Sequence, residues 1–154
     1  MTYESLIQAF GARYGLDGLA PEQGSATLSI DGNKVEIIDD ADAGAAVIYA
    51  EIGYPPPDAD GRFAEMMLKA NHLYLGTAGG TLCQNPETGV YVLMRPVPLA
   101  PLDGAETFGK ILEGVLSLVD QWQAMLGGHH EAETAADKEE TEARGLAIGG
   151  FLKV

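Results

Sequence analysis

The chain has 154 residues, and its 23 Asp and Glu against 9 Lys and Arg give a formal net charge of −14 at pH 7. This charge opposes binding to nucleic-acid phosphates or to an anionic bilayer, so we expect neither as a partner. A hydrophobic fraction of 46% with 21% charged residues indicates a globular protein, and no apolar run is long enough for a membrane-spanning helix. The N-terminal segment lacks the basic region of a secretory signal, and the single Cys83 cannot form an internal disulfide. Both features favour a cytoplasmic location.

The N-terminal half has the pattern of one helix followed by three strands. Residues 2–15 place apolar side chains along one side of a helix, with Thr2 as N-cap and Gly15 as its end. Alternating apolar and polar residues predict two strands that meet at a hairpin turn over 31–33. A third, uniformly apolar segment predicts a strand that is covered on both faces or keeps one face for a ligand. The three expected strands span residues 25–30, 34–38 and 45–54.

The C-terminal half has the pattern of a helix, two short strands and a last helix. The expected segments span residues 60–74, 81–85, 90–95 and 103–126. We expect Pro96, Pro98 and Pro101 to stop the sheet from extending, and Gly127-Gly128 to end the last helix. The element order is therefore αβββαββα, which predicts an α+β fold in which helices cover an antiparallel sheet.

A change in composition divides the chain into two regions. Residues 1–127 have the apolar periodicity of one α+β domain, whereas residues 128–154 form an acidic extension. Residues 131–144 carry almost no apolar side chains, so we expect the extension to be flexible or helical and exposed to solvent. Its apolar end, residues 146–154, could fold back on the domain, contact a neighbour or be disordered.

The residue types that carry chemistry do not form a catalytic or metal-binding pattern. Residues 104–110 match the spacing of a phosphate-binding loop, but Ile111 replaces the Ser or Thr that holds magnesium, and no strand precedes the loop. His129 and His130 are adjacent, and adjacent residues of a helix point apart, so they favour no specific metal site. We therefore expect no enzymatic activity, no cofactor and no metal.

Apolar residues in two regions exceed what a simple core requires. On the predicted helix 60–74 they form a stripe, which is either the buried side of a core helix or a surface shared with a second copy of the chain. Others, on the first helix and the strands, complete the core or mark a protein-recognition surface. An exposed strand edge beside them would accept an extended peptide as an added strand. The stripe comprises Phe63, Met66, Met67, Ala70 and Leu73, and the second set comprises Tyr3, Ile38, Val47, Tyr49 and Tyr54.

Six segments stand out by their order and spacing. They are a first helix ending in Phe10 and Tyr14-Gly15-Leu16, then TLSIDGNKVEI, AEIGYPPP, MLKAN and GVYVLMRPVPLAPLD, and a final helix ending near Trp122. With these segments the chain, from residue 3 to about residue 126, resembles the type III secretion chaperones of the CesT/Tir-chaperone family. The MLKAN segment is the part most similar to the family pattern. The long extension after Leu126 departs from the compact members.

The resemblance implies a small acidic homodimer that binds the N-terminal segment of a secreted effector and keeps it competent for export. It implies the export ATPase as a further partner and no catalysis. The implied effector-binding residues are Tyr3, Leu28, Ile38, Val47 and Tyr49. The implied dimer interface comprises Phe63, Met66, Met67, Ala70, Leu73, Val90 and Val92. The alternative is a non-catalytic regulatory or interaction domain of the same fold that binds a folded partner.

Overall fold

The computed structural model describes residues 1–55 and 60–149 of the chain, and side chains up to residue 128. Its elements follow the predicted order, with a short 3₁₀ turn added after the second helix. The helices are α1 (Tyr3–Tyr14), α2 (Arg62–Asn71) and α3 (Gly104–Gly149), and the 3₁₀ turn is η1 (His72–Tyr74). The strands are β1 (Ser25–Ile30), β2 (Asn33–Asp40), β3 (Ala45–Gly53), β4 (Thr81–Gln84) and β5 (Tyr91–Pro98). The predicted α+β fold is confirmed.

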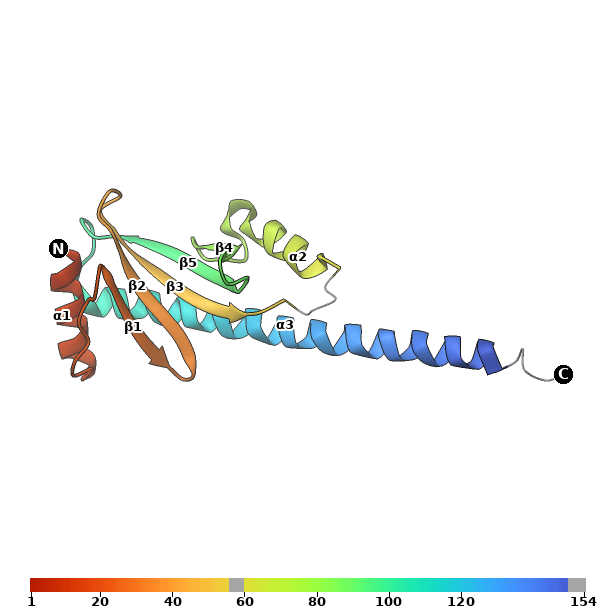
Figure 1. The fold of residues 1–154 in the computed structure, drawn as a ribbon. Coiled ribbons are helices and arrows are strands. Elements are labelled where there is room, and N and C mark those ends of the chain that lie inside the picture. The colour runs from red at the N-terminus through yellow and green to blue at the C-terminus, as the bar shows by residue number, and fades with distance from the viewer. Residues whose placement is uncertain (56–59, 150–154) are drawn as a thin grey trace.

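The five strands form one antiparallel sheet in the order β1-β2-β3-β5-β4, so β1 and β4 are its edges. One face of the sheet packs against α1 and α3 and forms the core (Figure 1). Alternation along β3 shows the two faces, because Ile48 and Ala50 are fully buried while Val47 and Tyr49 are half-buried on the opposite side. This second face of the sheet, which we call the open face, carries no helix over β1–β3.

Local sequence explains how α1 is placed against α3. The Thr2 hydroxyl accepts a hydrogen bond from the Ser5 N–H at 3.2 Å, and Gly15 ends the helix in the left-handed conformation, with φ 65°. The aromatic rings of Phe10 and Phe108 then meet edge to face, with centroids 5.5 Å apart. The predicted cap and end of this helix are therefore confirmed.

Strand β5 is longer than predicted, because it continues through Pro96 and Pro98. Pro96 pairs with Val47 and Pro98 with Ala45 on the β3 side, whereas the pairing with β4 begins only at Met94. Past Met94 the other side of β5 is a free edge, where a residue without an N–H costs no sheet hydrogen bond. The expectation that Pro96 stops the sheet was therefore wrong, because the sequence alone does not show which side of β5 lacks a neighbouring strand; β5 ends at Pro98.

Helix α2 ends at Asn71, earlier than the predicted residue 74, and Leu73 then adopts a left-handed conformation with φ 52°. The chain turns back over the helix end, where the Gly76 N–H donates to the Ala70 carbonyl at 3.0 Å. A Cβ on Gly76 would lie 2.7 Å from the Cβ of Ala70, so only glycine allows this close return. Leu73, the last residue of the predicted apolar stripe, therefore lies in the turn and not in the helix.

Helix α3 does not end at Gly127-Gly128 but continues to Gly149, and its second half projects beyond the sheet (Figure 1). Neither glycine has the positive φ of a helix C-cap, and an added Cβ at either would meet no other atom. Two interior glycines cost about 1 kcal/mol each, which a long helix rich in Ala, Glu and Lys tolerates. The predicted helix end was therefore wrong. Of the extension's apolar end, residues 150–154 lie outside the described part of the chain.

Candidate functional site

The edge of β1 offers unpaired backbone groups. The N–H and carbonyl of Ser25 point away from β2 and pair with Glu22 at 3.0 and 2.8 Å. Because strand residues alternate, the same groups of Thr27 and Ser29 also point outward, and within the described part of the chain neither residue has a partner on that side. Two exposed residues of β1 can therefore pair with an added strand.

A groove of about 830 Å³ lies along this edge. One wall is β1 and the other is the loop that follows α1, so the groove lies beside the unpaired edge of the strand. Three carboxylates line it, from Asp17, Glu22 and Glu36, and no Lys or Arg is among the described lining residues. The groove therefore favours a segment that carries basic side chains.

A smaller apolar pocket of about 230 Å³ lies between α1, α3 and the end of β1. Its walls are mainly aromatic and aliphatic, and Leu16 belongs to both this pocket and the groove. Glu113 is the one carboxylate among the described lining residues. The lining residues are Phe10, Tyr14, Leu16, Ile30, Gly109, Leu112, Glu113 and Leu116. An extended segment along β1 would thus bring a side chain to a pocket of the size and polarity of one large aliphatic residue.

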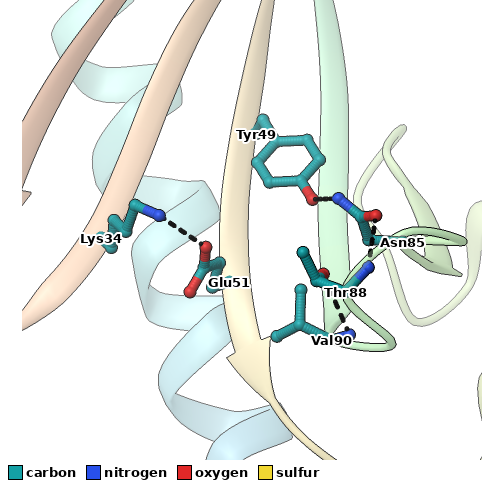
Figure 2. Close-up of polar contacts among 6 residues, drawn as sticks. All are labelled: Lys34, Tyr49, Glu51, Asn85, Thr88 and Val90. Atoms are coloured by element: carbon teal, nitrogen blue, oxygen red, sulfur yellow. Dashed lines mark hydrogen bonds and ion pairs between the residues drawn. The ribbon is translucent and has the colours of Figure 1, made fainter.

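Three of the predicted effector-binding residues, Ile38, Val47 and Tyr49, lie together on the open face. Ile38 pairs with Val47 across β2 and β3, and both side chains are half-buried. The Tyr49 hydroxyl accepts a hydrogen bond from the Asn85 amide at 2.8 Å, which holds the turn between β4 and β5 beside the sheet (Figure 2). The structure therefore brings these three residues into one partly apolar surface.

Polar contacts order the rest of this face. Lys34 and Glu51 form an ion pair at 2.9 Å between β2 and β3, and within the turn Asn85 accepts from the Thr88 N–H (Figure 2). Val90, which the resemblance places in the dimer interface, donates its N–H to the Thr88 hydroxyl at 3.4 Å. The open face is thus a mixed surface with a fixed turn at one side.

The other two predicted effector-binding residues lie on the helix side of the sheet. Tyr3, the first residue of α1, is buried between that helix and the sheet, and its hydroxyl donates to the Ile37 carbonyl at 2.6 Å. Burial, with the nearby charge of Asp39, raises the pKa of Tyr3 to about 12. Leu28 is half-buried against the core but lines the groove beside β1. Leu28 is thus within reach of a partner, whereas Tyr3 supports the fold.

The predicted interface residues fall into two groups. Within a single chain, the first group is already buried and the second is at least partly accessible. Phe63, Met67, Val90 and Val92 form the first group, and Met66, Ala70 and Leu73 form the second. Phe63 stacks on Tyr91 at 5.5 Å and meets Trp122 edge to face at 5.8 Å, which accounts for its burial.

Large apolar side chains crowd the turn after α2, and sequence periodicity missed most of them. Leu73, Tyr74 and Leu75 are 75%, 60% and 80% exposed, and Leu68 on α2 is 71% exposed. We call the three consecutive exposed residues Leu73, Tyr74 and Leu75 the α2 patch. Exposed large apolar side chains of this kind, on a chain with a charge of −14, are typical of a surface that contacts another protein. Three consecutive apolar residues, LYL, at a predicted helix end were the signal available in the sequence.

Groups able to do chemistry are sparse in the described residues. No cluster of three or more metal-binding side chains occurs among them; the side chains of His129 and His130 lie outside the described set. Burial raises the pKa of the Cys83 thiol, whose sulfur lies 3.6 Å from that of Met94. In the part of the chain that was searched, no helix is long and apolar enough to span a bilayer.

Comparison with known proteins agrees with this architecture. A model of the Tir chaperone protein (CesT) family matches residues 5–123, whereas no curated protein matches the sequence. Similar folds occur in the HopA1–SchA chaperone–effector complex, with 18% identity over 79% of this chain and 93% of that chain and a TM-score of 0.67. The ExsC–ExsE complex contains a chain with 22% identity, a coverage of 82% of this chain and 97% of that chain, and a TM-score of 0.67. The ExoU–SpcU complex of Pseudomonas aeruginosa gives 16% identity over 78% and 97%, with a TM-score of 0.62.

Proposed function

Since the chain belongs to the Tir chaperone protein (CesT) family of type III secretion chaperones, we propose that it binds the N-terminal segment of a secreted effector as an extended strand along β1. The observation that carries this proposal is the pair of outward residues, Thr27 and Ser29, both of which line the groove beside the β1 edge. An added strand regains on β1 the hydrogen bonds that it loses to water. While it is held in this way, it cannot form its own secondary structure.

Side chains then select the segment. One face of the bound strand lies toward the acidic groove, and a residue near its end reaches the apolar pocket next to Leu16. Burying one aliphatic side chain there contributes about 1.5–3 kcal/mol. The proposed client therefore carries a large aliphatic residue close to Lys or Arg. Beyond the groove, a longer client reaches Ile38, Val47 and Tyr49 on the open face.

We also propose that two chains form a homodimer through the α2 patch. Two copies with a charge of −14 repel each other, so contact requires a surface that is apolar and uncharged. Leu73, Tyr74 and Leu75 provide such a surface and would be buried on association. A dimer presents two β1 grooves, which raises the effective concentration of one for a client already bound to the other.

The remaining parts of the proposal concern the location of the protein, its lack of catalysis and its further partner. We propose a cytoplasmic chaperone that performs no catalysis and passes its client to the export ATPase. The alternative is a regulatory domain of the same fold that binds a folded partner. The two differ in what they hold, because a strand-binding chaperone protects an extended segment whereas the alternative needs a folded surface.

The test begins with the client. The gene for this chain is deleted in its bacterium, and the proteins secreted into the medium are compared by quantitative mass spectrometry. We expect one or a few effectors to be lost and then restored by the wild-type gene. Unchanged secretion in the deletion strain would contradict the proposed chaperone function.

A pair of variants then tests the site. Thr27→Pro removes the outward N–H without breaking a bond to β2 and obstructs strand addition. Thr27→Val keeps that N–H and serves as the control. We expect Thr27→Val to restore secretion and to bind the identified N-terminal segment normally, and Thr27→Pro to bind it at least about tenfold more weakly. Equal binding by both folded variants would contradict binding at β1.

A further inference from the structure

The turn that follows α2 is strained as well as exposed. Leu73 and Tyr74 have φ values of 52° and 58°, in the left-handed region that side chains with a Cβ rarely adopt. Residues held in such conformations cost free energy and persist only where surrounding contacts fix them. Three large apolar side chains are thus kept exposed by a backbone that would not adopt this shape by itself.

The contact that fixes the start of the turn comes from Asn71. Its side-chain amide donates to the Leu82 carbonyl at 2.9 Å, and its side-chain oxygen accepts from the Leu82 N–H at 2.8 Å. These are outward backbone groups of edge strand β4, because alternate residues of an antiparallel pair direct their N–H and carbonyl away from the neighbouring strand, and those of Leu82 bond to Asn71. The Asn71 amide therefore occupies the place of a further strand and ties the last residue of α2 to the sheet.

Two other contacts fix the far side of the turn. The Gly76 N–H donates to the Ala70 carbonyl, and the Trp122 indole N–H donates to the Gly76 carbonyl at 3.2 Å. The segment from Leu73 to Leu75 is therefore fixed at both ends while its side chains remain in solvent. Such an arrangement gives a preorganised contact surface, which loses little conformational entropy on binding.

We propose that Asn71 is the positioning residue of the α2 patch, and that its two bonds to Leu82 set the affinity of one chain for a second copy. This inference rests on the homodimer part of the proposed function. Asn71 itself lies beside β4 and not at the tip of the turn, so it acts through Leu73, Tyr74 and Leu75. Without its amide the turn relaxes toward unstrained conformations, and most of them do not present these three side chains together.

The experiment compares three variants of the full chain by sedimentation equilibrium and thermal unfolding. Asn71→Ala removes both bonds to Leu82. Asn85→Ala is the matched control, because Asn85 also uses its side chain to fix a turn at the opposite end of β4. Gly76→Ala displaces the turn from Ala70 without removing a side-chain hydrogen bond, and it gives a second measurement should Asn71→Ala fail to fold.

We expect the wild-type chain to be a dimer and both Asn71→Ala and Gly76→Ala to raise its dissociation constant at least about tenfold. Asn85→Ala lowers the melting temperature but leaves the dissociation constant within about twofold. A wild-type dimer whose dissociation constant is unchanged in the folded Asn71→Ala and Gly76→Ala variants overturns the role of Asn71 and leaves the dimer in place. A monomeric wild type overturns both the dimer and this inference, while client binding at β1 is judged separately by the Thr27 variants.

Discussion

Tyr3 ties the first turn of α1 to β2 through the hydrogen bond from its hydroxyl to the Ile37 carbonyl. Burial raises its pKa from 10.0 to about 12, so the folded chain keeps this proton at pH values where the unfolded chain has lost it. The contribution of Tyr3 to the free energy of unfolding is therefore fully present below pH 10 and is lost as the pH rises toward 12. At neutral pH, the hydrogen bond contributes about 1 kcal/mol.

Tyr3→Phe tests this contact. We expect the variant to lose about 1 kcal/mol at pH 7 and to show a shallower fall in the free energy of unfolding between pH 10 and pH 12. The measurement is urea denaturation at a series of pH values, with Tyr54→Phe, at an exposed position outside the α2 patch, as the control. An alkaline profile for Tyr3→Phe identical to that of the wild type would show that Tyr3 ionises freely in the folded chain.

Gly109 sits beneath the Tyr14 ring at the mouth of the apolar pocket, where an added Cβ would overlap the Tyr14 hydroxyl. Gly109→Ala alone should therefore give little gain in stability, because its helix propensity is offset by displacement of the ring. In a Tyr14→Ala background, the same substitution should stabilise the fold by about 1 kcal/mol. Denaturation of all four members of this double-mutant cycle measures the coupling. Equal effects in both backgrounds would place Tyr14 away from Gly109.

Sequence analysis missed the site residues whose role depends on their position in the sheet. Ile38, Val47 and Tyr49 could be chosen because they are apolar, and they do share one face. Thr27 and Ser29 could not be chosen from the sequence, because their polar side chains do not indicate a binding site. Their backbone groups are unpaired only because β1 is an edge strand of the sheet. The family resemblance places Tyr3 in the effector-binding surface, yet its side chain is buried between α1 and the sheet.

At the scale of elements, periodicity predicted every helix and strand, and the errors are all at ends. Asn71 ends α2 through a bond to a residue eleven positions later, and β5 continues through Pro96 because β4 does not reach that far. Both ends are decided by contacts between elements. Local propensity cannot contain that information, which is why the predicted ends at residues 74 and 95 were wrong.

The course of α3 through Gly127 and Gly128 can be tested by substitution. If both glycines lie inside a helix, Gly127→Ala and Gly128→Ala each add up to about 1 kcal/mol of helix stability and raise the helical circular dichroism signal. If instead the helix ended there with a left-handed glycine, alanine would be destabilising. Gly15→Ala, at a true left-handed C-cap, serves as the control and should lower stability.

At the scale of the whole molecule, the sheet separates two functions. Its β1 edge and the neighbouring pocket form the proposed client site, whereas the α2 patch beside β4 forms the proposed contact with a second copy. The family and the fold could be predicted from the sequence through the order of its segments. The patch could be predicted only in part, because Phe63 and Met67 of the apolar stripe are buried within the chain, while Tyr74 and Leu75 are exposed.

The dimer is tested at the exposed part of the patch. Leu75→Glu places a charge on a side chain that is 80% exposed, so it should leave the fold intact and shift the mass seen by light scattering from twice 16.2 kDa to 16.2 kDa. Met67→Glu is a poorer test, because Met67 is buried and a charge there would destabilise the chain itself. An unchanged dimer mass for the folded Leu75→Glu variant would exclude the patch as the interface.

The most direct test of client binding is backbone amide exchange at β1. The N-terminal segment of the effector identified by secretion is added at saturating concentration, and exchange is followed residue by residue by nuclear magnetic resonance. Strand addition predicts that the Thr27 and Ser29 amides slow by at least about tenfold, because each gains a hydrogen-bond partner. Unchanged exchange at both residues in a saturated complex would contradict binding along β1.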